Sequence, residues 1–448
     1  MPGLQESALG EEAPRRAALS KPVRLALWAL GFCAVLGLTW QWSAGTGVHN
    51  DFTQNVWLPS RLVLDGVNPY YPPASQVDMA LGAYRAEFDA FNGGPEYYFI
   101  YPLWLALAMT PFGAMPLLVA TAIWRAANVL LLLWGVAALL RKFNPAFRSN
   151  KPVALAALGM TLFLSLVYRE SILTLFIGQF AIVEFGLIVA VLGWLVTSHE
   201  AQGSRRLWGD VLAGVALGVL ATKPQSVGLP IVLLCIWALS RRRFAMPVSA
   251  IASFVLMLGL PALFYPNSIG DWLSVVFGRG QAASQAQVSA SVWGLAYNWL
   301  GADSPWRLIA LALTIAGVAA ILPWWWRDLR DKTSPMPMSL PLTLCMNSVI
   351  SPYMLGYEHV LLLIPALLYI AAAGLPGDSG LSGEELAGKK RLRMAMYTWM
   401  AVLPILVVAL QSVRGKEYPA IAQSLPMLAI CWVVRLTWTT NEGVKRET

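Results

Sequence analysis

Charged residues are scarce in this chain. Asp, Glu, Lys and Arg make up 12% of its 448 residues, while hydrophobic residues make up 57%. Soluble globular domains carry about 25% charged residues, so this composition excludes an ordinary soluble protein. Apolar runs recur from residue 25 to near the C-terminus. A helical crossing of a bilayer needs about 20 such residues, and the runs leave no room for a separate soluble catalytic domain.

Cysteines and nucleotide-binding motifs are also scarce. Cys33, Cys235, Cys345 and Cys431 lie in apolar runs without disulfide or metal-site spacing, and we interpret them as small buried hydrophobic residues. No complete Gly-x-x-x-x-Gly-Lys-Ser/Thr loop and no Asp-x-Asp pair occurs. We therefore expect no nucleotide and no cofactor; a divalent cation could bind but would not be required.

The net charge of +8 comes from basic residues in short loops rather than on one face. This pattern indicates membrane topology and not a nucleic-acid partner. If the apolar runs between them each cross once, the basic loops fall on one side, which the positive-inside tendency identifies as cytoplasmic. We expect both termini to be cytoplasmic. We expect the membrane to be the plasma membrane. The basic segments are 15–24, 205–206, 241–243, 327–332, 389–393 and 445–446.

The apolar runs predict an all-α integral membrane protein. Thirteen runs are candidates, but two cytoplasmic termini require an even number of crossings. The short run 100–114, bounded by Pro102 and followed by a basic loop at 141–151, is the misfit, so we expect about twelve spans. The runs are 25–42, 100–114, 116–140, 152–168, 179–197, 208–222, 226–240, 244–265, 307–326, 338–351, 358–373, 395–412 and 420–438.

This topology predicts one membrane domain, residues 25–438, between cytoplasmic tails at 1–24 and 439–448. Two large loops, 43–99 and 266–306, fall on the outer side. We expect the first of them to carry short amphipathic helices.

Asp51 opens the first outer loop, with His49 and Asn50 beside it. A carboxylate at the membrane surface can accept a proton from a hydroxyl whose reaction partner lies in lipid. The alternative is structural, because Asn50 and Asp51 could cap a short helix over Phe52–Leu64.

Glu87 and Asp89 are a second acidic pair in this loop. In an extended segment they would point to one side and could share a divalent cation, whereas on a helix they would diverge toward solvent. Tyr70 belongs to a set of aromatic residues that would suit stacking on sugar rings, although interfacial aromatic belts explain them equally well. The set is Tyr70, Tyr71, Tyr84, Tyr97, Tyr98, Trp293 and Trp299.

Two charged residues fall in or beside later apolar runs. Glu184 lies inside a run that begins near Gln179, and a carboxylate at that depth needs a partner. Arg125 in another run is the obvious candidate for a structural pair. Lys223 ends a run on the outer side, where its ammonium could bind a lipid phosphate or simply reach toward the surface.

Glu358 and His359 form the last outer corner, after Ser351–Tyr353. A histidine there can hydrogen-bond a sugar or phosphate oxygen, or assist proton transfer. An interfacial amphipathic role is the alternative.

Taken together, these residues resemble the polyprenyl-phosphate-mannose-dependent mannosyltransferases of glycosyltransferase family 87, in the GT-C membrane superfamily. The resemblance covers about residues 20–375. The family pattern often continues Gly-Gln-x-Asn, whereas Ala181 stands at the Asn position here. The matching segments are Asn50–Phe52, Leu64–Tyr70, Tyr101–Pro102, Gly178–Gln179, Ala213–Gly214 with Lys223–Pro224, and Ser351–Pro352 with Glu358–His359.

The resemblance implies a GT-C type helical bundle that transfers a sugar, with inversion, from a polyprenyl-phosphate donor on the outer membrane face. The acceptor would be a lipid or a glycan. Asp51 would be the general base, and Lys223 with His359 would stabilise the departing phosphate. The remaining substrate-binding candidates are His49, Asn50, Gln179, Glu358, Tyr70, Glu87 and Asp89.

Two other functions fit a multi-span protein of this kind. One is a lipid-linked sugar flippase or transporter, and the other is a non-catalytic protein that binds polyprenyl lipids. A transporter should place its charges and broken helices near the membrane midplane. Most candidate residues here collect at the outer ends of runs, which favours chemistry at one face.

Overall fold

The computed structural model describes residues 21–46, 51–92, 97, 99–149, 151–199, 201, 203–278, 287–375, 383–414 and 421–447. Over these residues the fold is entirely helical, without a strand. The predicted all-α, multi-span class is therefore confirmed.

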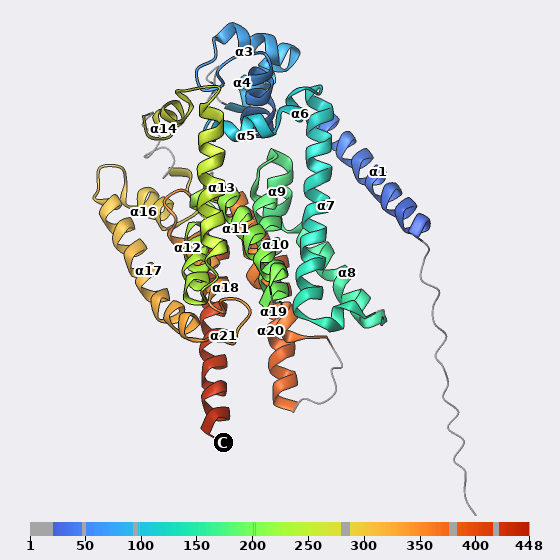
Figure 1. The fold of residues 1–448 in the computed structure, drawn as a ribbon, viewed down its shortest axis with the longest axis vertical. Coiled ribbons are helices and arrows are strands. Elements are labelled where there is room, and N and C mark those ends of the chain that lie inside the picture. The colour runs from blue at the N-terminus through green and yellow to red at the C-terminus, as the bar shows by residue number, and fades with distance from the viewer. Residues whose placement is uncertain are drawn as a thin grey trace, which may run out of the picture.

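The N-terminal part is one long helix followed by a cap of short helices, which lies at one end of the molecule (Figure 1). The first predicted loop contains short helices, and its placement on the outer side stays a prediction. Helix α5 has only 6 residues, or about 9 Å of helix, which is short for a crossing; that 100–114 does not cross stays a prediction. The elements are α1 (Lys21–Thr46), the π-helix η1 (Thr53–Trp57), α2 (Leu58–Leu64), α3 (Ala74–Leu81), η2 (Gly82–Tyr84), α4 (Arg85–Asn92), α5 (Leu103–Ala108) and α6 (Thr110–Gly113).

The middle of the chain forms longer helices that run away from this cap and back (Figure 1). Helices α8 and α9 meet at a bend of 53°. The elements are α7 (Leu117–Phe143), η3 (Pro145–Arg148), α8 (Pro152–Val167), α9 (Arg169–Ile177), α10 (Ala181–His199), α11 (Ser204–Leu220), α12 (Pro224–Ser240) and α13 (Ala245–Ala262).

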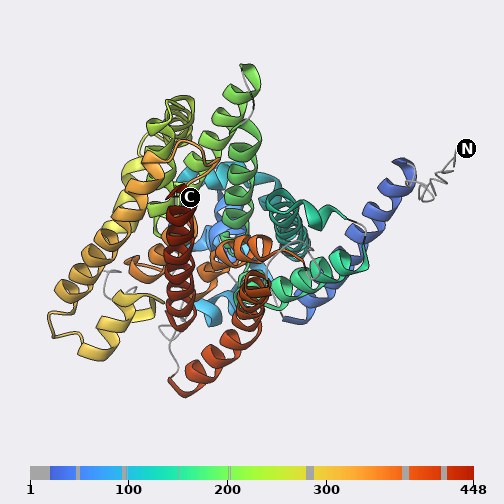
Figure 2. The same ribbon diagram turned by 90° about the horizontal axis from the view of Figure 1, so that it is seen from below.

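The C-terminal part includes a helix at the edge of the bundle, Trp306–Arg330, and the chain ends away from the cap (Figures 1 and 2). The last helix continues to Glu447, whereas the sequence predicted a tail from 439. The elements are α14 (Ser268–Gly278), α16 (Val292–Leu300), α17 (Trp306–Arg330), α18 (Leu340–Ile350), η4 (Gly356–Leu362), α19 (Leu363–Ala373), α20 (Gly383–Arg414) and α21 (Ile421–Glu447).

Six described helices are long and apolar enough to cross a membrane, or seven if the bent pair α8–α9 counts as one span. Four further apolar helices are shorter, at 224–240, 268–277, 340–350 and 421–434. The chain is thus a multi-pass membrane protein, and the count of about twelve stays a prediction.

Burial divides the apolar helices into two kinds. Of Gly356–Ala373, 94% is buried inside the protein, against 22% of α13 and 22% of the most apolar stretch of α17. A helix in contact with lipid keeps much of its surface outside the protein, so α13 and α17 have the exposure of lipid-facing helices. The segment η4–α19 instead forms the centre of the bundle, and this placement puts Glu358 and His359 inside the protein.

The cysteine interpretation holds for only part of the set. Cys345 and Cys431 are buried, Cys235 is half-buried and Cys33 is exposed, and all four are free. The expectation that Cys33 is buried is therefore wrong, because it lies on a face of α1 that other described helices do not cover. The Sγ atoms of Cys345 and Cys431 lie 3.5 Å apart.

Candidate active site

Asp51 is held in place by a close contact between two distant segments. Gly178 ends α9 with φ +74°, a backbone conformation that favours glycine. A Cβ on Gly178 would lie 2.5 Å from the Cβ of Phe52, so only glycine lets the two backbones approach. The Phe52 ring stacks on Trp124, whose indole N–H donates to the Gly178 carbonyl at 2.9 Å. These contacts place Asp51 beside Gln179.

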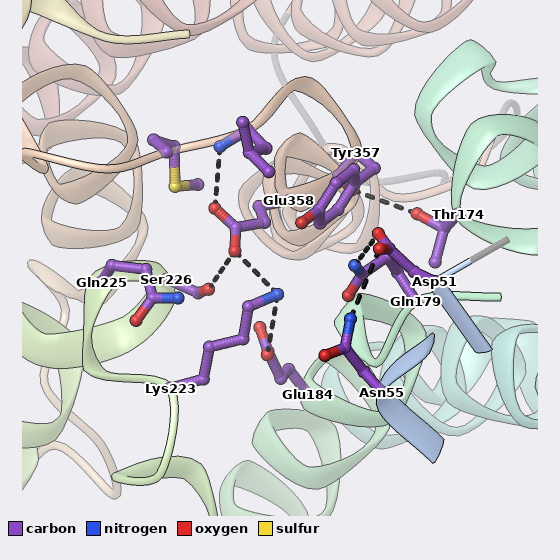
Figure 3. A network of polar contacts seen from close by, with 12 residues as sticks. Asp51, Asn55, Thr174, Gln179, Glu184, Lys223, Gln225, Ser226, Tyr357 and Glu358 are labelled. Carbon is purple, nitrogen blue, oxygen red and sulfur yellow. Dashed lines mark hydrogen bonds and ion pairs between the residues drawn. The ribbon is translucent and has the colours of Figure 1, made fainter. Parts of the chain in front are cut away.

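Asp51, Asn55 and Gln179 form a group that we call the aspartate group (Figure 3). The Gln179 amide donates to Asp51 Oδ2. Asn55 Nδ2 donates to Asp51 Oδ1 at 3.4 Å. Asp51 lies two residues before the short π-helical segment, a deformation that occurs often at functional sites. Two amides therefore orient the carboxylate, and the capping alternative stays open alongside this contact.

Lys223, Glu184 and Glu358 form a second group, the lysine cluster (Figure 3). Lys223 Nζ lies 2.7 Å from Glu358 Oε1 and 3.6 Å from Glu184 Oε1. All three side chains are buried. Burial alone would lower the pKa of the Lys223 ammonium, but the two carboxylates raise it well above its usual value. Lys223 is therefore charged, and it faces two carboxylates at once.

Glu358 is fixed from several sides. Its Oε1 accepts a hydrogen bond from Ser226 Oγ at 3.0 Å, and its Oε2 accepts the backbone N–H of Leu355 at 2.9 Å. The Tyr357 ring centroid lies 5.1 Å from Lys223 Nζ, a distance suited to a cation–π contact. The cluster is thus preorganised by residues of α12 and of the buried segment η4.

Tyr101 links the two groups. Its hydroxyl donates to Gln179 Oε1 at 3.5 Å. Burial raises the pKa of the Tyr101 hydroxyl; Lys223 lowers it, and Asp51, Glu184 and Glu358 raise it. The hydroxyl therefore stays protonated, and it is close enough to feel the charges of both the aspartate group and the lysine cluster.

The proposed Glu184–Arg125 pair is wrong. Glu184 instead faces Lys223. Arg125 donates to Ser43 Oγ at 2.7 Å and to the carbonyls of Leu175 and Phe176 at 3.2 and 2.9 Å. Carbonyls in the last turn of a helix lack partners within it, and Arg125 satisfies two of them in α9. Its role is to secure the helix that leads to Gln179.

Tyr70 supports the site from behind. Its hydroxyl donates to the Tyr101 carbonyl at 2.9 Å, and only 2% of the residue is exposed. The ring packs against Phe99 at a centroid distance of 5.3 Å. The expected stacking on a sugar ring is therefore wrong, because the ring is covered by protein.

Glu358 and His359 point to different neighbours although they are adjacent. His359 Nε2 lies 3.4 Å from Ser424 Oγ of α21. Tyr168 donates to the His359 carbonyl at 3.4 Å and, at 2.5 Å, to Gln423 Oε1. Successive residues of a 3₁₀-helix are about 120° apart, which explains why the histidine faces α21 while Glu358 faces Lys223.

Glu87 and Asp89 lie on helix α4 and not in an extended segment. The shared-cation arrangement is therefore wrong, because residues two apart on a helix diverge. Asp89 pairs with Arg85 at 2.9 Å. In the described part of the chain, no group of three or more His, Cys, Asp or Glu residues could hold a metal ion. His49 and Asn50 lie outside the described residues.

Sequence reasoning missed several contributors to the site. Asn55 stands four residues after Asp51, a helical spacing that could have revealed it. Tyr101 was noticed only as part of a matching family segment, and Ser226 had no signal, because their roles depend on tertiary contacts. Glu184 was noticed for its depth but assigned to the wrong partner.

The fold and site define a multi-span membrane protein with acid and amide groups preorganised around an internal lysine. The family model of glycosyltransferase family 87 matches residues 99–352, more than half of the chain. The chain therefore belongs to glycosyltransferase family 87. This confirms the predicted family and the prediction of a membrane glycosyltransferase.

Among solved structures, the chain is similar to ArnT from Cupriavidus metallidurans, which was crystallised bound to undecaprenyl phosphate. The sequence identity is 15% and the TM-score is 0.43, over 91% of this chain and 76% of that one. No curated protein matches in sequence. Family membership rests on the family model and not on the structural similarity.

Proposed function

We propose that this protein transfers mannose from a polyprenyl-phosphate donor to a lipid or glycan acceptor on the outer face of the membrane, with inversion at the sugar carbon. Asp51 is the general base in this proposal. The observation that carries it is a carboxylate oriented by Gln179 and Asn55. The buried Lys223 faces Glu184, which lies on α10 just after Gln179.

Inverting transfer needs a base for the incoming hydroxyl and a stabiliser for the departing phosphate. Asp51 takes the proton of the acceptor hydroxyl as its oxygen attacks the sugar carbon and the bond to the lipid phosphate breaks. Lys223 meets the negative charge on that phosphate. The contact with Glu184 is long, at 3.6 Å. When a phosphate oxygen replaces Glu184 at the Lys223 ammonium, the 2.7 Å contact between Lys223 and Glu358 can stay in place.

An apolar groove supports a lipid-linked donor. A cavity of about 540 Å³ lies between α8–α9 and α20, with Arg169 as its charged lining residue. Helix α9 forms one wall and ends at Gly178, next to Gln179 and Asp51. We propose that this groove holds the isoprenoid chain of the donor. Its apolar lining residues are Leu164, Val167, Ile172, Leu173, Phe176, Met400, Ala401, Pro404, Ile405 and Val408.

The test is transfer by the purified protein from polyprenyl-phosphate mannose to candidate acceptors, with released polyprenyl phosphate as the readout. A positioned base contributes about 100- to 10,000-fold, so Asp51→Asn should lower turnover by that factor with donor binding retained. Asp78→Asn is the control, because Asp78 is an exposed carboxylate of the same loop that pairs with Arg85.

Near-normal turnover of Asp51→Asn would leave Asp51 as a helix cap and end the proposed mechanism. Movement of a lipid-linked sugar across the bilayer without transfer, unaffected by Asp51→Asn, would support the flippase instead. Lipid binding with neither activity would support the non-catalytic alternative.

The orientation has its own test. The native cysteines are replaced, and a single cysteine is introduced at Ser75 or at Ser204. In intact cells, the two variants should differ in their labelling by a membrane-impermeant thiol reagent. Both positions are exposed, on α3 and at the start of α11. Ser75→Cys should be labelled and Ser204→Cys should not. The reverse pattern would place the site on the cytoplasmic face.

A further inference from the structure

A basic cavity lies at the far end of α12 from the lysine cluster. Its volume is about 350 Å³. It forms where α10 and α12 end, α11 and α13 begin, and the chain leaves α17. Helix α12 has 17 residues, so about 25 Å separates this cavity from Lys223. The lining residues are His199, Arg206, Ser240, Arg241, Arg242, Arg243 and Lys332.

Some of these cations are part of the framework. Arg243 is buried and forms an ion pair with Asp210. Arg241 donates to the carbonyl of Asp328 at 3.2 Å and to that of Asp331. Lys332 donates to the carbonyls of Ser240 and Leu329 at 2.8 and 2.6 Å. These bonds fix the floor and wall of the cavity before any ligand arrives.

Arg206 and Arg242 are different. Both are exposed, and neither forms an ion pair or a side-chain hydrogen bond within the described part of the chain. Arg242 also has φ 56°, the sole positive φ among the described non-glycine residues. A side chain disfavours that conformation, and residues held in it cluster at ligand sites. Glycine would fit the backbone of this turn best, yet the position holds Arg242, which lines the basic cavity.

Exposed apolar residues adjoin two of the lining residues in the sequence. Leu207 follows Arg206 and is 53% exposed, and Phe244 follows Arg243 and is 57% exposed. Apolar side chains beside arginine suit the boundary between acyl chains and headgroups. A ligand with a phosphate and acyl chains would match both the basic cavity and these apolar neighbours.

We propose that this basic cavity binds the phosphate headgroup of an anionic phospholipid, with its acyl chains against Leu207 and Phe244. The competing explanation is that these basic residues only set the orientation of the chain in the membrane. In that case all basic residues of these loops should be equivalent. A headgroup site instead distinguishes Arg206, which lines the cavity, from Arg205, which does not.

The test is native mass spectrometry of the full chain titrated with phosphatidylglycerol, phosphatidylcholine or glycerol phosphate. Phosphatidylglycerol should bind most tightly. Arg206→Gln should weaken its binding about fivefold, the effect of one surface cation, with little change for phosphatidylcholine. Arg205→Gln is the matched control and should behave like the wild type.

Arg242→Gly adds a variant that separates structure from binding. It relieves the unfavourable backbone, so its thermal midpoint in detergent should equal or exceed that of the wild type while phosphatidylglycerol binding weakens. Equal losses for Arg205→Gln and Arg206→Gln would overturn the proposal, as would equal affinity for the two phospholipids. Glycerol phosphate binding as tightly as the lipid would overturn the phospholipid assignment in favour of a soluble phosphate ester.

Discussion

The two ends of helix α12 hold buried cations in opposite ways. At its C-terminal end, Arg243 pairs with the single carboxylate of Asp210, and Ser198 Oγ accepts from the same guanidinium. At its N-terminal end, Lys223 faces Glu184 and Glu358 together. Both cations are almost fully buried, so the difference lies in charge balance and not in exposure.

A one-to-one pair is what a stable fold needs, because a buried charge without a partner is costly. One ammonium against two carboxylates leaves excess negative charge when both are ionised. Such a cluster can change its contacts when a ligand or proton arrives. The comparison suggests that the arginine end is structural and that the lysine end is reactive.

The largest effect is expected from breaking the balanced pair. Arg243→Met leaves Asp210 buried without its cation, and loss of one partner of a buried pair costs about 3–5 kcal/mol. Thermal unfolding in detergent should show a strongly lowered midpoint and poor yield. The double variant Arg243→Met/Asp210→Leu should recover much of the loss. An unchanged midpoint for the single variant would contradict the structural role of the Arg243–Asp210 pair.

Lys223→Met should weaken donor binding, and it should also lower the thermal midpoint because it leaves Glu184 and Glu358 buried without their cation. A hydrogen bond to a charged group is worth about 1.5–3 kcal/mol, so donor affinity should fall about 10- to 150-fold. Turnover should also slow, because the phosphate charge grows as the sugar leaves. Binding isotherms and single-turnover rates measure both. Normal donor affinity in a folded Lys223→Met protein would argue against phosphate at this lysine.

Filling the apolar groove should give a smaller effect. Ala401→Trp places a large ring among the groove residues, and overpacking costs about 1–3 kcal/mol. The KM for the polyprenyl donor should therefore rise about fivefold or more, with kcat at saturation nearly unchanged. Ala252→Trp, on the exposed surface of α13, is the control. A lower kcat without a KM change would assign the groove no role in donor binding.

The smallest effect is expected from Glu184. Glu184→Gln removes a carboxylate that competes with phosphate for Lys223, so donor affinity should be equal or about two- to fivefold tighter. Glu358→Gln, which disturbs the shorter contact and the Ser226 bond, should weaken donor binding. A weaker donor complex for Glu184→Gln would mean that this carboxylate itself binds substrate.

The membrane helices were predictable because the bilayer imposes a length and a composition on each span. Run 152–168 corresponds to α8, and run 244–265 to α13. The bend between α8 and α9 was not predicted, since it depends on packing around Tyr168. Motif resemblance pointed to both Gln179 and Asp51, and the structure brings the two side chains together.

Partner choice inside the bundle was less predictable. Glu184 and Arg125 are both buried charges in apolar runs, and the sequence gives no sign of which helices touch. Glu358 and His359 looked like one functional corner. The tight 3₁₀ geometry of η4 separates them, and the hydropathy of that segment carries no signal of it.

The burial of η4–α19 constrains how the protein is made. This segment carries Glu358 and His359, and 94% of Gly356–Ala373 is buried inside the protein. Charged groups are expensive in lipid, so Glu358 is costly in the bilayer until it meets Lys223. Synthesis runs from the N-terminus, and Lys223 therefore enters the membrane before Glu358 does. The counter-ion is thus in place before the carboxylate that pairs with it arrives.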